Sequence, residues 1–165
     1  MTLRIDPALD LTLERVVDVP VSLVWKAWTE PQHLMPWFCP RPWTTVACEI
    51  DLRPGGIFHT TMQSPEGERF PTTGCYLEVL PERRLVWTDA LGPGFRPSSR
   101  GFLTGDGGFY VTGVITLESL GADRTRYVAH ALHADPAGRD RHAAMGFHDG
   151  WGAALDQLVA YVKGW

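Results

Sequence analysis

The six histidines are the side chains of this chain best suited to proton transfer or metal binding. His142 and His148 fall within one predicted helix, but a spacing of six residues does not place them on one helix face. His130 and His133 are three apart in a predicted strand and therefore point to opposite faces. These spacings predict no metal site. They leave His148, one helical turn before Trp151, as a candidate general base if it faces a cavity and as a surface histidine if it does not.

Carboxylates, serines and glycines add no catalytic motif. Glu49 and Asp51 share a strand face, as an acid–base pair would, but Arg53 follows them at a strand end, which favours a solvated, ion-paired turn. The serines at 98–99 lack a Gly-x-Ser-x-Gly elbow. The glycines of 105–108 lack the lysine and the strand-to-helix context of a phosphate-binding loop. We therefore assign no catalytic residue, no metal and no cofactor.

The seven tryptophans are unusual in a chain of 165 residues. They indicate either a large aromatic core or a pocket for an apolar or aromatic ligand, because ligand sites are mostly lined by such side chains. Hydrophobic residues make up 44% and charged residues 21%, as in one folded domain. The net charge of −4 comes with scattered basic residues, which argues against a nucleic-acid or anionic-membrane partner.

Targeting signals and paired cysteines are not evident. Residues 1–10 contain no apolar run, so no signal peptide is expected. No stretch approaches the roughly eighteen apolar residues that a membrane span needs. Cys39, Cys48 and Cys75 are odd in number and far apart, which predicts free thiols and a cytoplasmic location.

The residue patterns predict one strand, two short helices, about six further strands in hairpins, and a final helix. Helical spacing is expected over 21–29 and, more briefly, over 34–38. Strands are expected over 11–19, 43–52, 57–63, 72–80, 84–90, 109–120 and 125–133. Since sequential strands usually pair as neighbours, the order predicts an α+β fold, in which a curved antiparallel sheet of about seven strands packs on a long C-terminal helix.

The segment 138–165 predicts one long amphipathic helix. Its apolar residues recur at helical spacing and form one stripe of Phe147, Trp151, Leu155, Leu158 and Val162. We expect the aliphatic half of this helix to hold it on the sheet and the glycine-rich half to border any cavity. The long connection 92–108 is expected to be either a flap over a site or a disordered loop.

Several short segments carry a resemblance to a known family. They are 15–20 (Arg-Val-Val-Asp-Val-Pro), 24–29 (Val-Trp-Lys-Ala-Trp-Thr), 49–56, 74–79, 84–88, 148–151 and 154–155. Together with the order of elements, they resemble the START-like (SRPBCC) superfamily and, within it, the AHSA group, similar to the C-terminal domain of the heat-shock-protein-90 ATPase activator. The resemblance implies a helix-grip fold, one domain over 1–165, and a cavity between the sheet and the long helix.

The resemblance places the strand face of Phe58 inside the fold and His59 outside. Large side chains from the strands and helices would then meet around the cavity. The candidate ligand-binding residues are Trp28, Trp37, Phe58, Thr60, Met62, Cys75, Leu77, Trp87, Phe147, His148 and Trp151. The alternative is that these side chains only fill the core.

Three functions follow from these expectations. The first is a small cytoplasmic protein that binds an apolar or aromatic, lipid-like small molecule. The second is a cyclase- or hydrolase-like enzyme that uses the same cavity, with His148 as its first candidate residue. The third is a partner of a chaperone ATPase, which is less favoured because only about ten residues precede the first strand. The sequence leaves a homodimer open.

Overall fold

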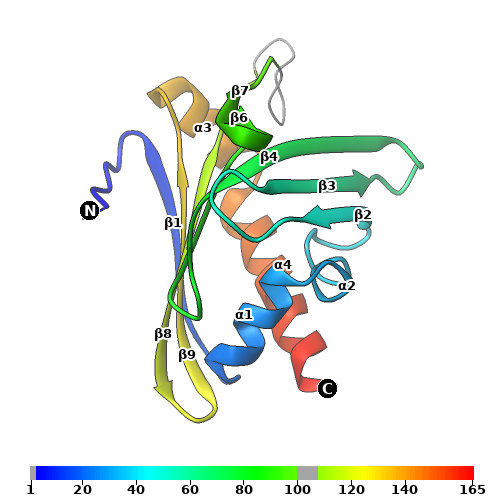
Figure 1. Ribbon diagram of the computed structural model, residues 1–165, viewed down its shortest axis with the longest axis vertical. Coiled ribbons are helices and arrows are strands. Elements are labelled where there is room, and N and C mark those ends of the chain that lie inside the picture. Colours follow the sequence, from blue (N-terminus) through cyan, green and yellow to red (C-terminus); the bar gives the residue numbers. More distant parts are fainter. Residues whose placement is uncertain (1–2, 100–107) are drawn as a thin grey trace.

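A seven-stranded antiparallel sheet, curled around one long helix, dominates the computed structural model, which describes residues 3–99 and 108–165 (Figure 1). The strand order is β1-β9-β8-β5-β4-β3-β2. The strands span Asp10–Val17 (β1), Thr44–Ile50 (β2), Ile57–Gln63 (β3), Arg69–Leu80 (β4), Arg84–Thr88 (β5), Thr112–Gly121 (β8) and Arg124–Leu132 (β9). This sheet confirms the predicted α+β helix-grip fold.

Two short helices connect the first strand to the rest of the sheet, as predicted. They are α1 (Val21–Thr29) and α2 (Pro31–Leu34). Pro31 starts α2 without loss of a backbone hydrogen bond, because the first N–H groups of a helix have no partner within it. Both helices lie beside the long C-terminal helix in Figure 1.

The C-terminal segment is two helices and not the single helix predicted over 138–165. α3 spans Pro136–Ala144 and α4 spans Phe147–Lys163. Gly146 separates them with a φ of 91°, a left-handed conformation that glycine adopts at little cost. Asp135 caps α3, because its carboxylate accepts a hydrogen bond from the Gly138 N–H at 2.7 Å.

The predicted apolar stripe of α4 faces the core. Phe147, Leu155, Leu158 and Val162 are each 2% exposed or less, and Trp151 is half-buried. Each such burial stabilises the fold by roughly 1.5–3 kcal/mol. The aliphatic half of the stripe therefore anchors the helix, as expected.

Among the register shifts of the sheet, two lie in strands that border the inner face near the site. The register shifts between Thr45 and Ala47 in β2, and between Tyr76 and Glu78 in β4. The extra residues, Val46 and Leu77, bend their strands and change which residues face the core. The second bulge has consequences for the site described below.

The first part of the connection 92–108 folds onto the outside of the sheet. It forms β6 (Leu91–Gly92), a short 3-10 helix η1 (Pro93–Phe95) and β7 (Arg96–Pro97). The Gly94 N–H donates to the Gly55 carbonyl at 2.8 Å, which holds this hairpin at the start of β3. The rest of the predicted flap, 100–107, lies outside the described residues.

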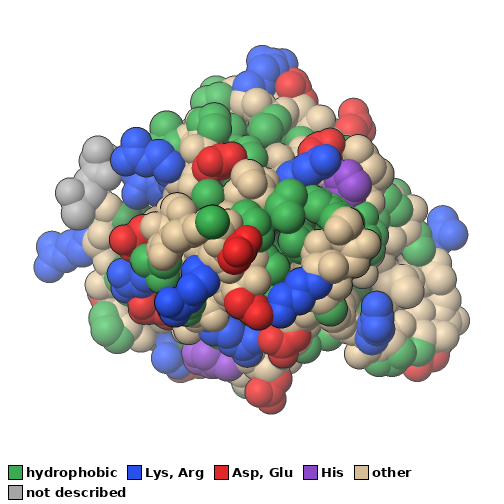
Figure 2. Space-filling view, turned by 90° about the horizontal axis from the view of Figure 1, so that it is seen from below, with side chains coloured by type: hydrophobic (Ala, Val, Ile, Leu, Met, Phe, Trp, Pro, Cys, Tyr) green, Lys and Arg blue, Asp and Glu red, His purple; other side chains and the backbone are tan. Residues whose placement is uncertain are grey.

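Charged side chains of both signs are interspersed on the face of the molecule seen in Figure 2. This mixture agrees with the scattered basic residues in the sequence. Among the residues that the structure describes, no helix is both long and apolar enough to cross a membrane.

Candidate functional site

Six aromatic side chains from five parts of the chain meet on the inner face of the sheet. We call them the aromatic cluster: Trp28, Trp37, Phe38, Phe58, Tyr76 and Trp87. Ring centroids of neighbours lie 4.8–6.0 Å apart, within the range of favourable aromatic contacts. Trp28 touches Trp37, Phe38 and Trp87, so it is the centre of the cluster.

Hydrogen bonds fix two of the indole rings. The Nε1–H of Trp28 donates to the hydroxyl of Tyr127 at 3.2 Å, and that of Trp37 donates to the Ala27 carbonyl at 3.3 Å. Both tryptophans are almost fully buried, with exposed fractions of 4% and 2%. They form a rigid wall.

Trp87 is less enclosed and lies against a backbone that leaves room for it. A Cβ atom on Gly113, its cross-strand partner, would come within 2.3 Å of the indole ring. Glycine at this position therefore allows the ring to lie flat on β8. Trp87 and Phe38 are only half-buried, so they are the members of the cluster with most freedom to move.

A row of polar side chains borders the cluster on the same face. Cys48, Thr60 and Thr72 are direct cross-strand neighbours on β2, β3 and β4. Tyr76 lies four residues after Thr72 on β4 and stacks on Phe58 with ring centroids 5.2 Å apart. These residues give an otherwise apolar region a small set of hydrogen-bonding groups.

Burial changes the acidities of two side chains of this part of the inner face, Tyr76 and Cys48. Burial, together with the nearby Cys48, raises the pKa of Tyr76 well above its ordinary value. Burial alone raises the pKa of Cys48 to about 11. Both groups are neutral at physiological pH.

A mostly apolar hollow opens beside the row. Its volume is about 320 Å³, at the small end of the range for ligand pockets. We call it the loop hollow, lined by Met35, Pro36, Cys39, Arg41, Trp43, Thr44, Thr45 and Gln157. Gln157 of α4 fixes the backbone at the edge of the loop hollow. The Gln157 side-chain amide donates to the carbonyls of Trp37 and Cys39 at 3.2 and 2.8 Å.

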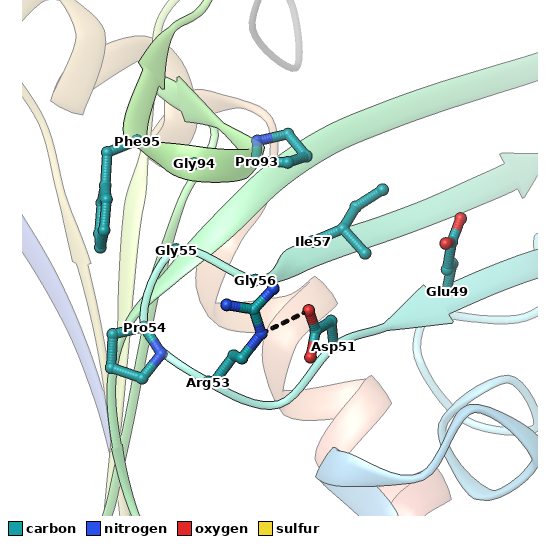
Figure 3. A pocket seen from close by; sticks show the side chains of 10 residues that line it. All are labelled: Glu49, Asp51, Arg53, Pro54, Gly55, Gly56, Ile57, Pro93, Gly94 and Phe95. Carbon is teal, nitrogen blue, oxygen red and sulfur yellow. Dashed lines mark hydrogen bonds and ion pairs between the residues drawn. The ribbon is translucent and has the colours of Figure 1, made fainter.

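A second hollow lies on the outer side of the sheet, near the start of β3 (Figure 3). It measures about 410 Å³ and is bordered by Phe95 on one side and by Arg53 and Asp51 on the other. Arg53 Nε donates to Asp51 Oδ2 at 2.7 Å, and both side chains are well exposed. The predicted solvated ion pair of this turn is confirmed for Asp51.

The structure brings together only part of the predicted ligand set. Trp28, Trp37, Phe58 and Trp87 belong to the aromatic cluster, and Thr60 is buried beside it. Met62 lies further along the same face of β3, opposite Phe70. The inner face of Phe58 and the outward position of His59, which bonds Thr73 and Thr61, are both confirmed.

Cys75 and Leu77 do not face the site, which corrects the prediction. Cys75 pairs with Ile57 and shares the outer face, where it is fully buried and its sulfur accepts a hydrogen bond from the Phe95 backbone. Leu77 is the extra residue of the bulge. Alternation counted back from Val79, which packs on the core, would place both inside, but the bulge reverses the alternation and puts Tyr76 there instead.

Phe147 and Trp151 lie in a different group of rings near the start of α4. We call it the histidine cluster: Phe109, His133, His142, Phe147 and Trp151, with neighbouring centroids 4.7–6.0 Å apart. His148 contacts only the edge of this group, with its ring centroid 5.0 Å from that of Phe147. The His148 side chain is exposed and bonds the Thr12 carbonyl at 3.1 Å, so the structure contradicts its predicted place in a cavity.

The two buried histidines form a hydrogen-bonded chain. His133 Nδ1–H donates to the Leu9 carbonyl at 2.8 Å, which leaves its Nε2 to accept from His142 Nδ1–H at 2.9 Å. Burial, with a smaller contribution from His133, lowers the pKa of His142 to about 4. His142 is therefore neutral at physiological pH, and its bond to His133 ties α3 to the end of β9.

Sequence reasoning missed Tyr76, Phe38 and Cys48. Tyr76 was hidden by the bulge, since simple alternation assigns its neighbours to the inner face. Phe38 and Cys48 carry apolar or weakly polar side chains next to predicted site residues, and their positions depend on the loop after α2 and on the bulge in β2.

The fold and the inner-face cluster together define a START-like helix-grip protein. Residues 18–163 match the family described as Activator of Hsp90 ATPase homolog 1-like protein, and the chain belongs to that family. No curated protein is similar enough to match the chain.

Solved structures of similar proteins agree with this assignment. A protein from Nitrosomonas europaea is 47% identical, with 97% of each chain covered and a TM-score of 0.89. A protein from Rhodobacter sphaeroides is 20% identical over 99% of this chain and 98% of its own, with a TM-score of 0.80. A protein from Arthrobacter aurescens is 22% identical over 95% and 87%, with a TM-score of 0.78. The last two support the fold alone.

Proposed function

We propose that this protein binds a small apolar or aromatic molecule at the aromatic cluster, with the loop hollow as the way in. The single observation that carries the proposal is the cluster itself, in which rings from α1, β3, β4, β5 and the segment after α2 converge on one place. Ligand sites for apolar molecules are mostly lined by such side chains, whose large rings supply much of the contact area.

The rings touch one another, so a ligand enters only if some of them move. Trp28 and Trp37 are buried and hydrogen-bonded, and they stay in place. Phe38 and Trp87 are half-buried and have no such bond among the described residues. Phe38 lies on the segment that also borders the loop hollow, so its displacement would join the hollow to the cluster.

Equilibrium dialysis with isopropenylnaphthalene, a neutral apolar probe, tests this proposal. We expect Trp87→Leu to weaken binding roughly tenfold, since a contacting tryptophan at a binding site is typically worth more than about 1.4 kcal/mol. Trp165→Leu is the matched control, because Trp165 is exposed at the C-terminus and should leave binding unchanged. Thermal unfolding of both variants shows that each is folded. Equal binding by the two variants, or no binding by the unchanged protein, would refute the proposal.

An enzyme built on His148 has no support from the geometry, because that imidazole is exposed and lies outside the aromatic cluster. The family description leaves stimulation of a chaperone ATPase as the second candidate function. An ATPase assay with the purified chaperone decides it: an increase in hydrolysis rate that requires this protein supports that role, and an unchanged rate removes it.

A further inference from the structure

Two hydroxyls on the inner face of β4 have no hydrogen-bond partner among the described residues. They are Thr72 Oγ1 and Tyr76 Oη, and both atoms are buried. They lie on the same face because they are four residues apart on β4, whose pairing is regular from Thr72 to Tyr76. A buried hydroxyl without a partner is costly, and most such groups in folded proteins are paired. Two such hydroxyls on one strand face therefore indicate a binding position for another polar atom.

Tyr76 is the stronger of the two indications. Its side chain is fully buried, with an exposed fraction of 0%, although the hydroxyl is the group that most favours water. Its ring is held by stacking on Phe58, so the hydroxyl cannot simply turn toward solvent. The neighbouring row of Cys48, Thr60 and Thr72 keeps this part of the inner face weakly polar.

The surroundings favour an uncharged partner. No lysine or arginine is among the buried residues of the described chain, and the buried histidines belong to the separate histidine cluster. An anion placed against Tyr76 would lose its hydration without gaining a counter-ion. A neutral oxygen would lose less, and the hydroxyl can donate to it.

From this geometry we infer that the ligand carries a neutral oxygen, as a ketone, ester or similar carbonyl group, which accepts a hydrogen bond from the hydroxyl of Tyr76 while its apolar part fills the aromatic cluster. This inference rests on the proposed function and adds the chemical class of the ligand. It also makes Tyr76 a residue that determines specificity and not only a wall of the site.

Two probes of the same planar shape test the inference. Acetonaphthone carries a carbonyl oxygen where isopropenylnaphthalene carries a CH₂ group. We expect the unchanged protein to bind acetonaphthone about fivefold to tenfold more tightly than isopropenylnaphthalene, the effect of one buried hydrogen bond. Tyr76→Phe should remove this preference, because the phenylalanine ring still stacks on Phe58 but has no hydroxyl to donate. Naphthoate, the charged counterpart, should bind more weakly than both.

Control variants separate the outcomes. Tyr161→Phe removes a hydroxyl that bonds His33 far along α4, and it should keep the preference for the ketone. If both probes bind equally to the unchanged protein and to Tyr76→Phe, the inference is overturned while the proposed function stands. If Thr72→Val removes the preference and Tyr76→Phe does not, the assignment to Tyr76 is overturned. If neither probe binds, both proposals fail.

Discussion

The aromatic cluster and the histidine cluster both bury polar groups among rings, but they treat those groups differently. In the histidine cluster, His142 donates to His133, and His133 donates to the Leu9 carbonyl. In the aromatic cluster, the indoles of Trp28 and Trp37 are paired, while the hydroxyl of Tyr76 has no partner among the described residues.

This difference separates a structural role from a binding role. A buried polar group whose bonds are made within the protein stabilises one packing arrangement and has nothing left for a ligand. A buried group without a partner costs free energy in the absence of a ligand, and binding can recover that cost. The comparison therefore predicts that removing a paired polar group lowers stability, whereas removing the unpaired hydroxyl of Tyr76 does not.

The largest effect is expected from His142→Ala. The substitution removes a buried ring that contacts Phe109, Phe147 and Trp151, and it leaves His133 Nε2 without its donor. The free energy of unfolding should fall by roughly 3–4 kcal/mol, which urea denaturation measures. His148→Ala is the control, since that exposed side chain makes one hydrogen bond and one ring contact, with Phe147, and should cost less than about 1 kcal/mol. A loss below that of the control would mean that the histidine chain does not support the fold.

The free energy of unfolding should also depend on pH through His142 of the histidine cluster. The pKa of His142 is about 4 in the folded protein, against 6.5 for a histidine side chain in water, so the unfolded chain takes up the proton first. Stability contributed by the neutral imidazole is complete above about pH 6.5 and is lost as the pH falls toward 4, by up to about 3 kcal/mol. Denaturation curves of the unchanged protein and of His142→Phe should diverge in this window. Parallel curves would show that His142 is not buried as a neutral ring.

The smallest stability effect compares two buried tyrosine hydroxyls, one with a hydrogen-bond partner and one without. Tyr127→Phe removes the acceptor for the Trp28 indole and should cost about 1–2 kcal/mol. Tyr76→Phe, in the ligand-free protein, removes an unpartnered hydroxyl and should cost nothing or raise the free energy of unfolding slightly. The two variants are matched in chemistry and burial, and thermal unfolding compares them. A larger loss for Tyr76→Phe would contradict the distinction between paired and unpaired buried groups.

Most of the fold could be predicted from periodicity and turn residues, because these are local properties. The bounds of α1 and β3 agree with the predicted 21–29 and 57–63. The break at Gly146 was missed, since the apolar stripe begins only at Phe147 and gives no information on residues 138–146, and the left-handed backbone of Gly146 reveals the end of α3. A helix interior tolerates glycine at a cost of about 1 kcal/mol, so the presence of a glycine at position 146 did not by itself predict that the helix ends there.

The site was harder to predict because it depends on register. Alternation along β4 gives opposite answers on the two sides of Leu77, and a bulge is a property of the pair of strands and not of one of them. The bond between His133 and His142 joins the end of β9 to α3 across a turn, at a spacing that no metal or helix pattern highlights. Hydrogen-bond satisfaction, which distinguishes the two clusters, has no signature in the sequence.

The structure of the complex with acetonaphthone tests the central claim most directly. We predict that the naphthalene rings lie among Trp28, Phe58 and Trp87, with the carbonyl oxygen about 2.6–3.0 Å from Tyr76 Oη, the usual length of such a bond. The histidine cluster should be unchanged. A ketone bound only in the outer hollow beside Arg53, or one within the cluster whose oxygen points away from Tyr76, would contradict the account.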